Sequence, residues 1–190
     1  RKPGALFIFD IKSSTNLANY IKQHGGEPLM WKTGHSFIKA KMKETGAELA
    51  GEMSGHIFFK ERWFGFDDGL YSAARMLEIL SKRSQHSSAV FAELPDSFNT
   101  PELQIHFAEG EHYKFMEKLK QQADFDGADM ITIDGMRVNF PDGWGLIRPS
   151  NTTPALTFRF EAEDEAALEQ IKAQFRDLLR RIAPDMPPPF

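Results

Sequence analysis

Cysteine is absent from the 190 residues, which excludes a disulfide framework, a Cys-based metal site and a thiol nucleophile. No apolar stretch reaches the roughly 18 residues of a membrane span. The first residues, RKPGALFIFDIKSS, lack the long apolar core and small-residue cleavage site of a secretory signal. These absences fit a reducing compartment, and we expect a cytoplasmic protein.

The sequence also lacks a dense basic cluster interleaved with aromatic residues, so we do not expect nucleic-acid binding. Charge is unevenly distributed instead. Residues 1–95 hold 13 Lys and Arg against 10 Asp and Glu, whereas residues 96–190 hold 10 against 17. This asymmetry indicates two modules, of which the mildly positive first could attract a small anion.

The first half alternates strand-like and helix-like segments. The nearly unbroken apolar run at residues 5–11 is typical of a strand buried on both faces. Ser13 or Ser14 offers an N-cap for the helix that follows, and Asp67 or Asp68 offers one for a third helix. We also expect a strand at 28–31 and a second helix that ends at Gly46. Each of the three helices carries an apolar stripe: Leu17, Tyr20, Ile21 and His24 on the first, Phe37, Ile38 and Met42 on the second, and Leu70, Ala74, Leu77 and Leu80 on the third. The alternation predicts an α/β layer with a largely parallel sheet.

A loosened, Ser- and Pro-rich stretch around residues 85–101 places a domain boundary near residues 95–97. We therefore expect domains at 1–96 and 97–190. The second half predicts strands at 103–108, 130–133, 136–140 and 155–161, and helices at about 112–123 and after an Asp164 N-cap. Asp134-Gly135 indicates a two-residue hairpin turn. This half predicts an α+β arrangement, an antiparallel sheet with helices on one face.

One segment, GEMSGH at residues 51–56, carries an acid, a hydroxyl and an imidazole at alternate positions. If the segment is extended, Glu52, Ser54 and His56 point to the same side. Such groups at the edge of a core element suit sugar hydroxyls, because charge-assisted hydrogen bonds are strong and directional. The alternatives are a solvated, glycine-flexed turn and a metal site using Glu52 and His56.

The stretch WGLIRPSNTTP at residues 144–154 lies in a segment, 143–160, that contains two arginines and no acid. Arg148 offers a bidentate fork for phosphate, and the loop adds short donors from Ser150, Asn151, Thr152 and Thr153. The alternative is an ordinary polar hairpin loop, since these residue types are common in turns.

Lys12 ends the first buried strand, and His35 lies in the turn before the second helix. In open α/β sheets, ligands bind beyond the carboxyl ends of the strands, where both residues and the GEMSGH segment would meet. Taken singly, Lys12 is as well explained as a solvated strand end and His35 as a neighbour of a helix cap. Their expected convergence is what favours a site.

Four segments, FDIKSS, MWKTGHSFIKAKMKETGA, GEMSGHIFFKERWFGFDDGLYSAARMLEIL and GWGLIRPSNTTP, closely resemble the C-terminal half of bacterial phosphomannomutase/phosphoglucomutase, in the α-D-phosphohexomutase superfamily. The resemblance spans essentially the whole chain. It implies the third of four domains, an α/β sandwich with a mixed, largely parallel sheet, followed by the fourth, a TATA-binding-protein-like antiparallel sheet with helices on one face.

The resemblance also implies roles for individual residues. Glu52 and Ser54 would bind the sugar's 3- and 4-hydroxyls, and His35 would line the substrate cleft. Lys12 and His56 are the candidates for assisting proton transfer. The remaining matched positions form a phosphate clamp: Arg148, Ser150, Asn151 and Thr152.

By the same resemblance, the parent enzyme interconverts 1-phospho and 6-phospho forms of mannose and glucose through a bisphosphorylated intermediate, as an isomerase. Its phosphoserine loop, its magnesium motif and therefore its Mg²⁺ ligands do not occur in this sequence. We interpret the chain as a fragment cut at a domain boundary, inactive alone. Domains 1 and 2 of the parent are its implied partners, glucose 1,6-bisphosphate is the parent's implied activator, and we expect a monomer. A standalone phosphosugar-binding module and a purely structural domain are the alternatives.

Overall fold

The computed structural model describes residues 2–190. These residues form two compact units, which divide between Asp96 and Ser97 and are called unit 1 and unit 2. Unit 1 contains a five-stranded sheet in the order β2-β1-β3-β4-β5. Its strands are β1 (Leu6–Asp10), β2 (Glu27–Trp31), β3 (Leu49–Gly51), β4 (Ile57–Phe59) and β5 (Phe66–Asp67). The three strands β2, β1 and β3 are parallel, whereas β4 and β5 are antiparallel additions at the edge. The expected mixed sheet is confirmed.

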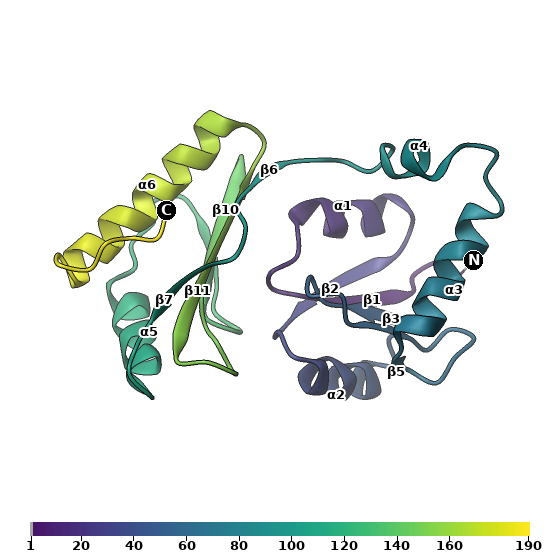
Figure 1. The fold of residues 1–190 in the computed structure, drawn as a ribbon, viewed down its shortest axis with the longest axis horizontal. Coiled ribbons are helices and arrows are strands. Elements are labelled where there is room, and N and C mark those ends of the chain that lie inside the picture. Colours follow the sequence, from purple (N-terminus) through teal and green to yellow (C-terminus); the bar gives the residue numbers. More distant parts are fainter. Residues whose placement is uncertain (1) are drawn as a thin grey trace. The chain divides into compact units, whose positions relative to one another are not determined.

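Two helices of unit 1, α1 (Thr15–Gln23) and α2 (His35–Thr45), lie on opposite sides of this sheet (Figure 1). The main core forms under α2, where Ile38 and Met42 pack against Ile8, Ala50 and Phe58. The remaining helices of the unit are α3 (Gly69–Leu80) and the short α4 (Ser87–Phe91).

The helix caps of unit 1 follow the sequence. The Ser14 side chain accepts a hydrogen bond from the Asn16 N–H at the start of α1. The Asp68 side chain accepts one from the Tyr71 N–H at the start of α3. Gly46 ends α2 in the left-handed conformation, as its lack of a Cβ permits. These contacts decide between the paired alternatives of the sequence, in favour of Ser14 and Asp68.

The expected apolar stripe of α3 does not face the core. Leu70 is 88% exposed and Leu77 is 66% exposed, and α3 contains no buried residue. The periodicity correctly predicted an amphipathic helix, but periodicity cannot identify what, if anything, covers its apolar face.

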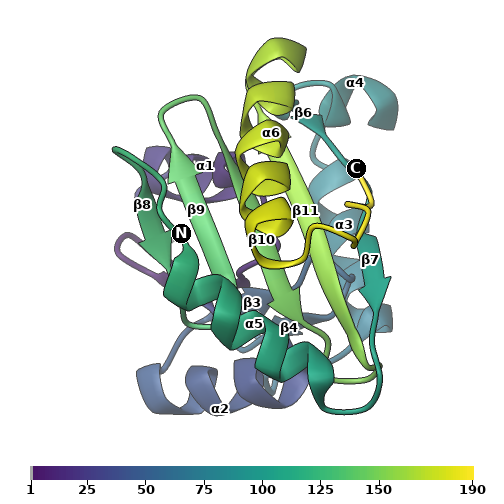
Figure 2. The ribbon, with the colours of Figure 1, turned by 90° about the vertical axis from the view of Figure 1, so that its left-hand side faces the viewer.

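Unit 2 contains an antiparallel sheet in the order β6-β11-β10-β9-β8, with β7 also paired to β11. Its strands are β6 (Phe98–Asn99), β7 (Leu103–His106), β8 (Asp129–Ile131), β9 (Met136–Phe140), β10 (Gly143–Pro149) and β11 (Ala155–Ala162). The helices α5 (Glu111–Gln122) and α6 (Glu165–Ile182) cover one face of this sheet (Figure 2). The expected α+β arrangement is confirmed, as is the Asp164 N-cap of α6.

Glycines on β10 let α6 approach the sheet closely. A Cβ at Gly145 would lie 2.4 Å from the Phe175 ring, and one at Gly143 would lie 2.7 Å from Ile171. Phe175 and Ile171 are both buried. The main core of unit 2 therefore depends on small residues in the strand as much as on large ones in the helix.

The expected two-residue turn at Asp134-Gly135 is wrong in its length. β8 ends at Ile131, which pairs with Arg137, so residues 132–135 connect the two strands. Gly135 has φ +84°, and a Cβ there would lie 2.3 Å from the Ile147 carbonyl oxygen. The connection is thus shaped by its packing against β10, which the local sequence signal does not contain.

Candidate functional site

The carboxyl ends of the parallel strands β2, β1 and β3 are tied together by one buried carboxylate. Asp10, the last residue of β1, accepts hydrogen bonds from Ser13 Oγ at 2.7 Å, Thr33 Oγ1 at 3.1 Å and the Met53 N–H at 3.1 Å. These donors come from the segments that follow β1, β2 and β3 respectively. Asp10 therefore fixes three loops at the sheet edge where ligands of α/β proteins usually bind.

Segment 51–56 is a hairpin turn between β3 and β4, not the extended strand considered above. The Glu52 N–H donates to the His56 carbonyl at 2.9 Å, and the Gly55 N–H donates to the Glu52 carbonyl at 2.9 Å. Gly55 has φ +95°, which favours glycine. The turn places Glu52 and His56 opposite each other and leaves Ser54 exposed at the tip.

Glu52 is buried, and its two oxygens differ. Oε2 accepts the Gly34 N–H at 2.9 Å, at the N-cap of α2, whereas buried Oε1 has no hydrogen-bond partner among the described residues. Burial raises the pKa of Glu52, and the charge of Asp10 acts in the same direction, against the Gly34 hydrogen bond and the nearby His56 and Lys12. A buried acceptor without a donor is costly, so Oε1 is suited to a donor supplied by a ligand.

The ring of His56 is oriented by the carboxylate of Asp67, a residue that the sequence offered as an N-cap of the third helix. Its Nδ1 lies 2.7 Å from Asp67 Oδ2, at the end of β5. The neighbouring Asp68 caps α3, so the two adjacent acids have separate tasks. The His35 ring centroid is 5.8 Å from that of His56, and His35 is the first residue of α2. With Nδ1 engaged by Asp67, His56 Nε2 is the ring nitrogen left for proton exchange with a ligand.

Lys12 lies in the turn after β1, which ends at Asp10, and not at the strand end. It is buried, with 6% exposure, so the interpretation as a solvated strand end is excluded. Its positive charge lowers the pKa of Glu52, although the net shift of that pKa is upward. The structure therefore gathers Lys12, His35, Glu52 and His56 at one edge of the sheet in unit 1.

In unit 2, the loop between β10 and β11 is organised by Ser150. The Ser150 Oγ accepts from the Thr152 and Thr153 N–H groups, both at 3.3 Å, and from the Thr153 hydroxyl at 3.0 Å. The Ser150 N–H donates to the Ala155 carbonyl at 2.9 Å and closes the loop. Asn151, Thr152 and Thr153 are exposed on this tight turn, with their polar groups available to solvent or a ligand.

Arg148, near the end of β10, is buried beside this loop with 5% exposure. Its Nε donates to Asp134 Oδ2 at 3.1 Å, and its Nη2 has no hydrogen-bond partner among the described residues. Arg148, which lies in the segment without acids, is thus paired with an acid from the connection between β8 and β9. Asp134 orients one edge of the guanidinium and leaves Nη2 for an anion.

Asp10, Asp67 and Asp134 were missed as site residues by the sequence reasoning. Each is an acid with at least one partner that lies 11 or more positions away in the sequence. Asp67 and Asp134 did attract attention, but only as a cap and a turn residue. Their partners are set by strand order, which local spacing does not encode.

Residues 2–190 contain no group of three His, Asp or Glu side chains that could hold a metal ion. The described residues therefore do not fit the magnesium that the family resemblance implies, and Glu52 and His56 have no third ligand. None of the helices in the same residues combines the length and apolar character needed to cross a membrane.

Comparison with known proteins identifies both units. Residues 1–98 match the family described as phosphoglucomutase/phosphomannomutase, alpha/beta/alpha domain III, and residues 102–178 match the phosphoglucomutase/phosphomannomutase C-terminal domain. A Pseudomonas putida phosphomannomutase/phosphoglucomutase is 54% identical over 190 residues, covering 100% of this chain and 41% of that protein. A Neisseria meningitidis phosphoglucomutase is 60% identical over 181 residues, covering 94% and 39% respectively.

A solved structure gives the same result for the fold. The crystal structure of a phosphoglucomutase/phosphomannomutase family protein from Burkholderia thailandensis has a TM-score of 0.92 and 54% identity, covering 99% of this chain and 40% of that one. The chain thus spans about two fifths of the length of the relatives it matches. It belongs to the phosphoglucomutase/phosphomannomutase family and comprises that family's domain III and C-terminal domain.

Proposed function

We propose that the chain is the sugar- and phosphate-recognition half of a phosphohexomutase that interconverts 1-phospho and 6-phospho forms of mannose and glucose. The observation that carries the proposal is Glu52, a buried carboxylate with one oxygen held by Gly34 and the other without a partner. Family membership and the names of the relatives at 54–60% identity support the phosphosugar as its ligand.

In this proposal, Glu52 Oε1 accepts a hydrogen bond from one hydroxyl of the sugar ring. Ser54, which is exposed at the tip of the same turn, binds the neighbouring hydroxyl. The 3- and 4-hydroxyls are oriented alike in glucose and mannose, so a site that reads these two hydroxyls accepts both sugars. A charged acceptor contributes roughly 1.5–3 kcal/mol per hydrogen bond, enough to fix the orientation of the ring. His35, beside His56, lines the same site.

His56 and Lys12 handle the proton. When a sugar hydroxyl attacks phosphorus, it must lose its proton, and when the other ester is cleaved the leaving oxygen must gain one. His56 Nε2 takes or returns that proton while Asp67 holds Nδ1. Lys12 supplies positive charge near the reacting oxygen. Asp67 does not touch the substrate in this scheme and is a positioning residue.

Arg148 and the Ser150–Thr152 loop hold the phosphate that is not reacting. Phosphoryl transfer depends chiefly on positioning and charge stabilisation, so a clamp that retains one phosphate while the other end of the sugar reacts serves both half-reactions. Arg148 Nη2 and the exposed polar groups of Asn151 and Thr152 are the donors. Ser150 acts mainly through the loop, because its Oγ already accepts several hydrogen bonds.

The remaining chemistry belongs to the longer protein. A serine outside this chain carries the phosphoryl group, passes it to the substrate to form a bisphosphorylated sugar, and regains the other phosphoryl group from it. Mg²⁺, for which the described residues form no three-ligand cluster, would stabilise the charge on the transferred group. Glucose 1,6-bisphosphate is the activator in this scheme, because it can phosphorylate an unloaded serine.

The test is a pair of assays. Purified residues 1–190 are expected to show no turnover of glucose 1-phosphate, and the full gene product is expected to convert it to glucose 6-phosphate. NMR titration of residues 1–190 with mannose 6-phosphate is expected to shift signals near Glu52 or Arg148 weakly. The proposal is wrong if the full gene product neither turns over nor binds either phosphosugar.

A standalone phosphosugar-binding module is the second candidate, favoured by the completeness of the Arg148 loop within unit 2. It requires residues 1–190 alone to bind mannose 6-phosphate as tightly as the full gene product does. Isothermal titration of both proteins with the same sugar distinguishes the two functions.

A further inference from the structure

Two amphipathic helices of unit 1 lack a partner on the face of the sheet away from the main core. Neither α1 nor α3 contains a buried residue. Leu17 and Tyr20 on α1 are 41% and 38% exposed, and Leu77 and Ile79 on α3 are 66% and 51% exposed. Helices in soluble domains normally bury such a face, because burial of the apolar face supplies most of their stability.

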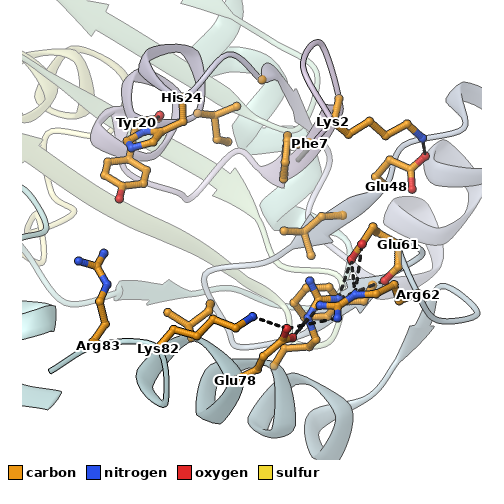
Figure 3. A pocket seen from close by; sticks show the side chains of 17 residues that line it. Lys2, Phe7, Tyr20, His24, Glu48, Glu61, Arg62, Glu78, Lys82 and Arg83 are labelled. Carbon is orange, nitrogen blue, oxygen red and sulfur yellow. Dashed lines mark hydrogen bonds and ion pairs between the residues drawn. The ribbon is translucent and has the colours of Figure 1, made fainter.

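A pocket of about 760 Å³ lies between these helices, within unit 1. Phe7, Leu49 and Phe59 from β1, β3 and β4 line it, together with Ile21 of α1 and Ile79 of α3. Figure 3 shows Tyr20 and His24 along one side and Glu78, Lys82 and Arg83 along the opposite side. An apolar strip of the sheet is therefore left uncovered between two helices.

The charged residues at the rim of this pocket already have ion-pair partners. Arg62 donates to Glu78 at 2.7 Å and 3.2 Å, and Lys82 donates to the same carboxylate at 2.7 Å. The Arg62 hydrogen bonds lower the pKa of Glu78 to about 2. Lys2 pairs with Glu48 at the other end. Arg75 pairs with Glu61, and Arg83 pairs with Glu93 beyond the pocket. Because each Lys and Arg of the rim thus has a carboxylate partner, the rim does not favour a small anionic ligand, and the apolar strip determines what binds.

We infer that this pocket receives an amphipathic helix from the part of the longer phosphohexomutase that lies outside the 190 residues. A third helix laid between α1 and α3 would cover Ile21 of α1, Ile79 of α3 and the strip formed by Phe7, Leu49 and Phe59. The relatives that cover this chain have more than half of their length outside it, so they contain the additional polypeptide that the inference requires. The inference rests on the proposed function, which makes the chain one part of such an enzyme.

The 190 residues contain no cysteine, and any cysteine in the rest of the full gene product is replaced by serine, so a single introduced thiol reports the accessibility of one position. Ile79→Cys places the thiol in the pocket, and Leu94→Cys is the matched control, because Leu94 is 50% exposed and does not line the pocket. Each variant is made in residues 1–190 and in the full gene product. The rate of reaction with 5,5′-dithiobis(2-nitrobenzoic acid) is measured for all four proteins, and circular dichroism confirms that each is folded.

In residues 1–190 the two thiols are expected to react at similar rates. In the full gene product, Cys at position 79 is expected to react at least tenfold more slowly, with the control unchanged. Equal reactivity at position 79 in both proteins overturns the inference. A full gene product that contains only these 190 residues also overturns it. Protection that appears in residues 1–190 only as concentration rises identifies a second copy as the occupant and also overturns it.

Mutase activity is measured on the same full-length samples and separates this inference from the proposed function. Protection of position 79 without turnover of glucose 1-phosphate rejects the proposed function but supports the inference that a helix occupies the pocket. Turnover without protection of position 79 supports the proposed function and rejects the inference about the pocket.

Discussion

The Nδ1 atom of His56 lies 2.7 Å from Oδ2 of Asp67, although 11 positions separate the two residues in the chain. β4 and β5 create this proximity, because they pair antiparallel and return the chain to the turn that carries His56. Asp68, the next residue, faces α3 and caps it. Two adjacent aspartates thus provide a matched pair for experiment, one aimed at the proposed site and the other at helix stability.

Asp67→Asn is expected to lower kcat of the full mutase by about 10- to 100-fold, because His56 loses the carboxylate that orients its ring. KM is expected to change little, since Asp67 does not touch the sugar. Steady-state kinetics with glucose 1-phosphate measure both parameters. Asp68→Asn is the control and should retain near-normal kcat, and a kcat equal to wild type in Asp67→Asn would remove the pair from the mechanism.

Glu52→Gln is expected to stabilise residues 1–190 at pH 7 by up to about 1 kcal/mol. The pKa of Glu52 is raised in the folded state, so ionisation opposes folding. That cost is absent below the ordinary value of 4.5 and is fully present once pH exceeds the raised value. The gain should therefore disappear as pH falls toward 4, which urea denaturation at several pH values can follow.

Glu27→Gln, at the exposed start of β2, is the control for this measurement and should leave the free energy of unfolding unchanged. In the full enzyme, Glu52→Gln should instead reduce kcat/KM, because the sugar hydroxyl loses a charged acceptor. A variant that is destabilised at pH 7 would show that the carboxylate is needed for the fold and not for a ligand.

Arg148→Ala is expected to lower kcat/KM of the full enzyme by an amount equivalent to roughly 2–4 kcal/mol of transition-state stabilisation, because the phosphate loses a charged hydrogen-bond donor. Arg148→Lys keeps the charge but lacks the fork, so it should recover only part of the loss. Arg180→Ala, on the exposed side of α6, is the matched control. Thermal unfolding must accompany the kinetics, because both variants remove the hydrogen bond from Arg148 Nε to Asp134. Unchanged kinetics would exclude Arg148 from the clamp.

Gly135→Ala is expected to destabilise the chain by more than about 2 kcal/mol, because a Cβ would lie 2.3 Å from the Ile147 carbonyl oxygen at a φ of +84°. Gly127→Ala is the control, since Gly127 also has positive φ, +68°, but has open space around its Cβ position. It should cost only about 1 kcal/mol, from backbone strain alone. Equal urea midpoints for the two variants would show that the close packing of Gly135 is unimportant.

Local chemistry in the sequence was sufficient for much of the fold. Apolar runs and helical periodicity predicted most of the strands and helices, although not β10, which the sequence analysis left between two expected strands. Asp164 and Gly46 marked a helix start and a helix end because their side chains, or the lack of one, suit those positions. The parallel and antiparallel character of the two sheets followed from the spacing of these elements. The motifs around Glu52 and Arg148 indicated, by resemblance, which family to expect.

Tertiary structure alone decided which residues meet. Asp10 joins three loops, Asp67 joins His56 and Asp134 joins Arg148, each across a distance in sequence that only strand pairing closes. The sequence left GEMSGH open between an extended segment and a glycine-flexed turn, and it predicted an apolar stripe on α3. The hairpin and the exposure of Leu70 and Leu77 depend on neighbours beyond the local window. Residue spacing determines which face a side chain occupies, but the packing of distant segments determines what that face contacts.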